Sequence, residues 1–97
     1  MCIDKTALLV TDFYSKAQLD NRITATHISL YVALLHEMVC VDSVVLLLRP
    51  DVIMSLAKIS SRVTYHRCMR ALHDYGYILY EPSFRPGESK VSLIVLI

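Results

Sequence analysis

The sequence predicts a small, mainly helical α+β domain. Its 97 residues are the length of one domain, and 55% of them are hydrophobic, which is enough for a single core. Apolar residues recur at helical spacing in four segments, and β-branched or alternating runs bounded by turn residues mark three short strands. With only two Gly and three Pro, the composition excludes the disordered and collagen-like classes.

Two helices are expected in the first part of the chain. The first runs from about residue 4 to residue 19, and the second begins at Thr24 or Thr26, since either hydroxyl can cap a first turn. A short strand over Val41–Leu48 follows, because the run is β-branched and bounded by turn residues. The helical stripes are formed by Ile3, Ala7, Val10, Tyr14 and Ala17 and by Ile28, Tyr31, Leu34, Leu35 and Met38.

The second half predicts two helices and a hairpin. Pro50 suits the first position of a short third helix that ends near Ile59, and Ser60 or Ser61 caps a fourth helix over residues 62–75. Gly76 supplies a left-handed helix stop. Strands are expected over residues 77–81 and 89–97, joined by a turn-rich connection. The apolar stripe of the fourth helix is Tyr65, Cys68, Met69 and Leu72.

Charge is distributed unevenly along the chain. Residues 1–48 carry three basic and five acidic groups, whereas residues 49–97 carry seven basic and four acidic groups. The segment from Lys58 to His73 contains four basic residues and no acid. A local positive patch on a nearly neutral protein attracts phosphate without making the whole molecule adhesive. The alternative is an ordinary solvated helix face, in which Arg70 pairs with Asp74 four residues later.

From residue 24 onward this order of elements is typical of a winged helix–turn–helix domain, in which the second helix of the motif enters the major groove. The residues Ser61-Arg62-Val63-Thr64-Tyr65-His66, followed by Gly76-Tyr77-Ile78, resemble the recognition helix and wing entrance of small bacterial proteins of this family. The resemblance covers about three quarters of the chain. It implies a winged helix domain at residues 23–97, preceded by an extra N-terminal helix at residues 1–22 that is a candidate dimerisation element.

The resemblance and the charge pattern together predict a protein that binds double-stranded DNA, either a transcriptional regulator or an accessory factor of a mobile element. Arg67 is expected to contact a base, because a guanidinium matches the two acceptors of guanine. Ser61, Thr64 and the amides at the helix start suit phosphate. The residues expected at the DNA interface are Lys58, Ser61, Arg62, Thr64, His66, Arg67, Arg70, Arg85 and Lys90.

One alternative function is a protein-interaction module that kept the fold without binding DNA. The low net charge, the high apolar content and the sparsely charged wing favour it. The final strand is apolar on both faces, with Ile94 and Leu96 opposite Val91 and Val95, so it needs cover from the leading helix or a partner subunit. That two-sided strand, like the leading helix, also suggests a homodimer. No small-molecule ligand is expected, because 97 residues leave no room for a separate sensing domain.

Catalytic and metal sites are not expected. The chain has no glycine-rich phosphate loop, nucleophile elbow, paired catalytic carboxylates or Cys-x-x-Cys motif, so we predict no enzyme activity, no metal and no cofactor. Cys2, Cys40 and Cys68 are odd in number and far apart, which favours a reducing compartment. No signal peptide or membrane-spanning run is visible, and we expect a cytoplasmic location with no membrane partner.

Overall fold

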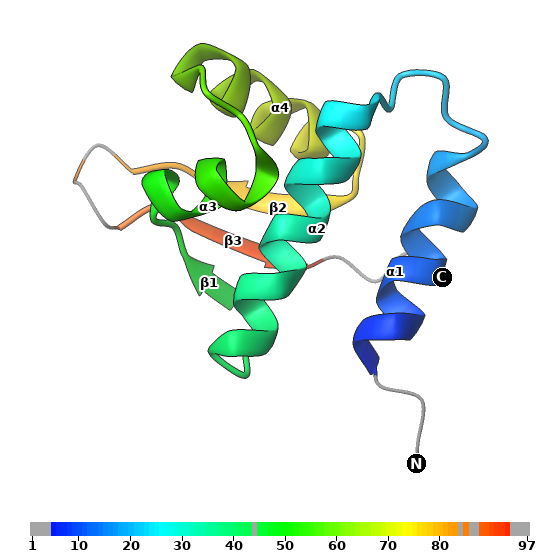
Figure 1. Cartoon of the computed structure of the whole chain (residues 1–97), viewed down its shortest axis with the longest axis horizontal. Coiled ribbons are helices and arrows are strands. Elements are labelled where there is room, and N and C mark those ends of the chain that lie inside the picture. The colour runs from blue at the N-terminus through cyan, green and yellow to red at the C-terminus, as the bar shows by residue number, and fades with distance from the viewer. Residues whose placement is uncertain (1–4, 44, 84, 86–87, 94–97) are drawn as a thin grey trace.

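The computed structural model describes residues 5–43, 45–83, 85 and 88–93, with side chains from residue 9 onward. This part of the chain forms a mainly helical α+β domain, as expected (Figure 1). Helix α2 lies at the centre, with α3 on one side and α1 on the other. The elements are α1 (Lys5–Ala17), α2 (Ala25–Cys40), β1 (Val45–Leu47), α3 (Pro50–Ala57), α4 (Arg62–Asp74), β2 (Ile78–Glu81) and β3 (Lys90–Leu93).

The helix boundaries follow local capping chemistry. Thr24 precedes α2, and its backbone amide donates to Nδ1 of His27 at 3.0 Å. Ser61 precedes α4, and its hydroxyl accepts from the Thr64 amide at 3.3 Å. Gly76 follows α4 with φ of 85°, the left-handed conformation that glycine adopts without steric cost. These three expectations from the sequence are confirmed.

The strand expected over residues 41–48 is shorter than predicted. Helix α2 continues to Cys40, and the chain turns through Val41 and Asp42, where Asp42 has φ of 54°. The amides of Val41 and Ser43 donate to carbonyls of the last helical turn, so helix capping overrides the β-branched preference of this run. Among the described residues of this run, the strand is Val45–Leu47. The expected final strand is described at Lys90–Leu93, and its continuation over residues 94–97 lies outside the described residues.

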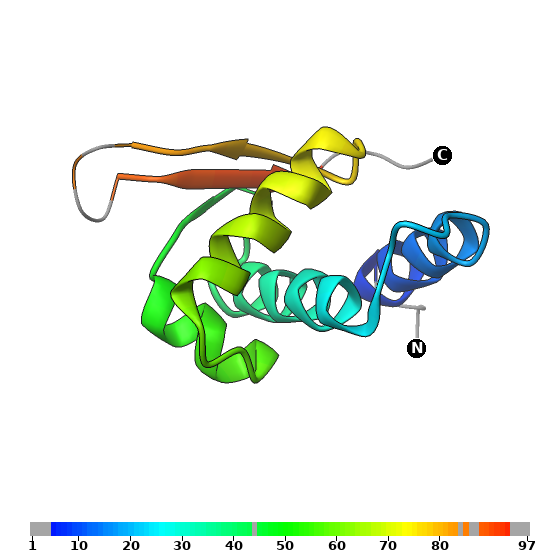
Figure 2. The same cartoon turned by 90° about the horizontal axis from the view of Figure 1, so that it is seen from above.

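The hairpin expected from the sequence belongs to a three-stranded antiparallel sheet in the order β1-β3-β2. Strand β1 pairs with β3, with Leu46 opposite Val91, and this long-range pairing left no local signal in the sequence. The helices cover one face of the sheet (Figure 2). The side chains buried beneath them are Leu46, Ile78, Tyr80 and Val91, whereas Val45, Leu47 and Leu79 are exposed on the other face.

Helix α1 contributes to the same hydrophobic core as the rest of the chain. The Phe13 ring is fully buried and stacks on Tyr31 of α2 with centroids 4.0 Å apart, while Tyr77 meets it edge-on at 5.4 Å. Stacked and edge-to-face aromatic pairs stabilise a core beyond their buried area. A dimerisation role for residues 1–22 stays a prediction. None of the described helices combines the length and apolarity needed to cross a membrane.

Replacing Phe13 with Ala should destabilise the whole domain by about 3–5 kcal/mol, because it removes a buried ring and leaves a cavity beside Tyr31. Denaturant unfolding followed by circular dichroism measures this change. The matched control is Tyr14→Ala, since Tyr14 is the next residue of α1 but is 45% exposed. Equal effects of the two substitutions would contradict the placement of α1 in the core.

Candidate nucleic-acid interface

Helix α4 is divided lengthwise into a buried face and an exposed basic face. Tyr65, Cys68, Met69 and Leu72 are at most 5% exposed, as the apolar spacing predicted. Burial raises the pKa of the Cys68 thiol, in keeping with a role in packing. On the opposite side His66, Arg67 and Arg70 are exposed to solvent. We name the surface formed by His66, Arg67 and Arg70 the α4 basic face.

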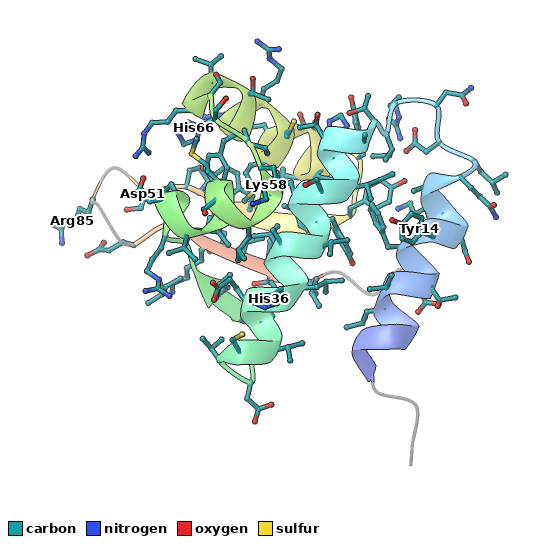
Figure 3. The ribbon with its side chains drawn as sticks, in the orientation of Figure 1. Tyr14, His36, Asp51, Lys58, His66 and Arg85 are labelled. Atoms are coloured by element: carbon teal, nitrogen blue, oxygen red, sulfur yellow. The ribbon has the colours of Figure 1, made fainter. Side chains whose placement is uncertain are left out.

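The surrounding elements hold α4 by its apolar side. It packs against α2 and β2, and the short α3–α4 connection over residues 58–61 fixes its first turn. His66 and Asp51 lie at the same end of the molecule as Arg85, which marks the β2–β3 hairpin (Figure 3). Of the α4 basic face, His66 thus lies toward the hairpin end of the molecule.

A shallow hollow of about 330 Å³ opens beside the first turn of α4. Lys58, with φ of 61°, contributes its exposed side chain, and Ser61 and Thr64 come from the start of α4. Thr26 and Ser29 line it from α2, and Ser29 donates its hydroxyl hydrogen bond to the Ala57 carbonyl. The first turns of two helices and one lysine converge on this hollow, an arrangement that favours anions.

Arg62 forms an ion pair with Asp51, an acid that lies outside the acid-free segment of the sequence. Its Nη2 lies 2.6 Å from Oδ1 of Asp51 in the first turn of α3. The segment from Lys58 to His73 has no acid in sequence, but the fold brings this one to its edge. Both side chains are more than half exposed, so the pair contributes little stability and is open to competition by another anion. Among the described residues, Arg70 and Asp74 do not form the ion pair that their spacing suggested.

The two hairpin cations also have acidic neighbours. Arg85 is exposed, with Nη1 4.0 Å from Oε1 of Glu88. Lys90 is exposed and stands directly opposite Glu81 in the β2–β3 register, so the two side chains share a face of the sheet. The described part of the hairpin is thus nearly balanced in charge. The site predicted from the sequence separates into seven residues at α4 and its preceding turn, and two on the hairpin.

The far end of α4 is anchored by a contact that sequence reasoning missed. The Asp20 carboxylate accepts two hydrogen bonds from the Arg22 side chain at 2.9 Å and one from the Tyr77 hydroxyl at 3.1 Å. The Arg22 guanidinium lies 4.0 Å from the centre of the Tyr75 ring. The Arg22 hydrogen bonds hold the pKa of Asp20 well below its usual range. The α1–α2 turn is thereby joined to the residues that follow α4.

Replacing Asp20 with Asn should lower the melting temperature at neutral pH, because an amide cannot accept the paired guanidinium bonds as a carboxylate does. A depressed folded-state pKa stabilises the protein above the unfolded value and loses that effect as the pH falls. The difference between wild type and D20N should therefore shrink between about pH 5 and pH 2. Circular dichroism melts measure it, with D42N, in the exposed α2–β1 turn, as the control. A difference that does not change with pH would contradict the anchoring role of the carboxylate.

The chain was also compared with known proteins. It matches no protein-family model, no characterised protein and no solved structure. The geometry and charge of the residues described above are therefore the basis for proposing a function.

Proposed function

We propose that the chain is a winged helix–turn–helix protein that binds double-stranded DNA, with α4 in the major groove. The observation that carries this proposal is the α4 basic face, which is exposed along a helix whose other side is buried. A major groove about 12 Å wide admits an α-helix in this way. The proposed role is binding without a catalytic step, in a cytoplasmic regulator of transcription or an accessory factor of a mobile element.

The arrangement of elements supports the proposal. Helices α3 and α4 are joined by a short turn, and the β2–β3 hairpin follows directly, which is the order found in winged helix domains. His66 of the α4 basic face lies at the same end of the molecule as Arg85 of the hairpin (Figure 3). A duplex lying against that end can contact both. The near balance of charge on the hairpin leaves most of the attraction to α4.

Each basic residue has a distinct role in this proposal. Arg67 reads a base, because its planar guanidinium fits the O6 and N7 acceptors of guanine. Arg70 and Lys58 contact phosphates of the DNA backbone. The hollow at the start of α4 receives a further phosphate, which the Thr64 hydroxyl and the helix amides bind. Arg62 joins them when a phosphate displaces Asp51.

The alternative is a protein-interaction module. An apolar surface on α4 would favour this alternative. Among the described residues of α4, the exposed large apolar side chain is Val63, which is 66% exposed. The neighbouring exposed side chains of the helix are mostly polar or basic. This composition favours DNA over an apolar protein partner, since phosphates attract guanidinium groups and large exposed apolar patches mark protein interfaces.

Substituting the two arginines should separate base reading from phosphate attraction. R67A should reduce the discrimination between bases at one position of the preferred DNA site by about 1–3 kcal/mol. The selected sequences should then vary at that position. R70A should weaken binding to all duplexes and reduce the slope of log affinity against log salt by about 0.9. Fluorescence anisotropy with a random duplex pool, followed by selection of bound sequences, measures both effects.

The matched control for these variants is K5A, which removes a cation from α1, away from the hairpin end (Figure 1). It should leave the selected sequence unchanged. Wild-type protein that binds no duplex at low salt would overturn the DNA proposal and leave the protein-interaction alternative. A selected sequence that survives R67A unchanged would remove Arg67 from base reading.

Freeing Arg62 should strengthen nonspecific DNA binding. D51N removes the carboxylate that holds the guanidinium, so the variant should bind random duplexes more tightly, with a salt slope steeper by up to about 0.9. It should also cost about 0.3–1 kcal/mol of stability, because Asp51 lies in the first turn of α3. The control D74N changes net charge equally without touching Arg62. If D51N and D74N have the same salt slope, Arg62 does not contact phosphate.

A further inference from the structure

We propose that His36 and Cys40, on the exposed face of α2, bind Zn²⁺ together with the same two residues of a second copy of the chain. Both side chains are exposed and four residues apart on the helix, and His36 is labelled on α2 in Figure 3. Residues at this spacing lie on one face of a helix. This site is separate from α4 and from the proposed DNA interface.

The two side chains are close enough together to reach one zinc ion. The Cys40 Sγ lies 3.9 Å from Nδ1 and 4.0 Å from Nε2 of His36. Zinc bonds of about 2.3 Å to sulfur and 2.0–2.1 Å to nitrogen, meeting at a tetrahedral angle, place the two donor atoms about 3.6 Å apart. Because the sulfur is almost equally far from both ring nitrogens, the His36 ring must turn to direct one nitrogen toward a metal held by Cys40. Thiolate and imidazole are also the donors that favour zinc over magnesium or calcium.

One chain supplies half of a closed site. No group of three or more His, Cys, Asp or Glu side chains placed to hold a metal occurs in the part of the chain that the structure describes. Structural zinc is held by four ligands, so two His–Cys pairs complete a Cys₂His₂ set. The binding reaction releases one proton from each Cys40 thiol as its sulfur–zinc bond forms.

The surface beside the pair suits a second copy of α2. Val32 and Val39 are 40% and 52% exposed, and with His36 they follow the spacing of one helix face. The packing of α2 against α1, α3 and α4 leaves these two valines exposed. Two copies related by a twofold axis bring valines against valines and each His36–Cys40 pair against its equivalent, since such an interface uses the same patch on both chains.

Titration of the reduced full chain with Co²⁺ and then Zn²⁺ tests this site without DNA. We expect a thiolate-to-cobalt charge-transfer band, one metal per two chains, and a monomer-to-dimer shift on metal addition in sedimentation velocity. C40S should lose the charge-transfer band. H36A should weaken metal binding by more than roughly 10- to 100-fold. That is the cost of losing a residue that only hydrogen-bonds to a ligand, whereas H36A removes a ligand itself.

The matched control is H66A, which removes an exposed histidine on α4 and should leave the cobalt spectrum and the dimer unchanged. A charge-transfer band that survives C40S would overturn the site. One tightly bound metal per monomer would overturn the shared site. Failure of the DNA experiments leaves these results unaffected, because the titration contains no DNA.

Discussion

The burial of one side of α4 is the constraint on which the remaining features depend. Tyr65, Met69 and Leu72 are almost fully excluded from solvent between α2 and the sheet. A helix fixed by these side chains cannot rotate about its axis without exposing them, so the opposite side is presented in one orientation. Arg67 and Arg70 are held outward by the same packing that builds the core. A binding surface on a rigid helix loses less conformational entropy than one on a loop.

The electrostatics of the molecule are local. A net charge of +1 leaves no strong overall field, and the fold places Asp51 beside Arg62, Glu88 near Arg85 and Glu81 opposite Lys90. These exposed contacts add little stability, but each reduces the positive potential available to a phosphate. Lys58, Arg67 and Arg70, on α4 and the turn before it, take part in none of the ion pairs of the described residues. That distribution favours a defined contact over general adhesion to polyanions.

Helix α2 connects the parts of the fold because each of its sides meets a different neighbour. Tyr31 receives the Phe13 ring of α1, other apolar residues meet α3 and α4, and the remaining side carries His36 and Cys40 in solvent. The Asp20–Arg22–Tyr77 contact then joins the turn before α2 to the end of α4. Leading helix and basic helix are thus linked through packing and hydrogen bonds. The apolar spacing of residues 3–17 predicted this helix, but did not indicate which residues its rings contact.

The sequence by itself determined the helices, their caps and the split of α4 into apolar and basic sides, because these features depend on residues within four positions of one another. Ser61, Gly76 and the seam from Tyr65 to Leu72 were all predictable on this ground. Only the tertiary structure decided the addition of β1 to the hairpin, the pairing of Arg62 with Asp51 and the bond from Tyr77 to Asp20. The two side-chain contacts join residues that are 11 and 57 positions apart in the sequence. The register of β1 against β3 follows from the packing of the complete core.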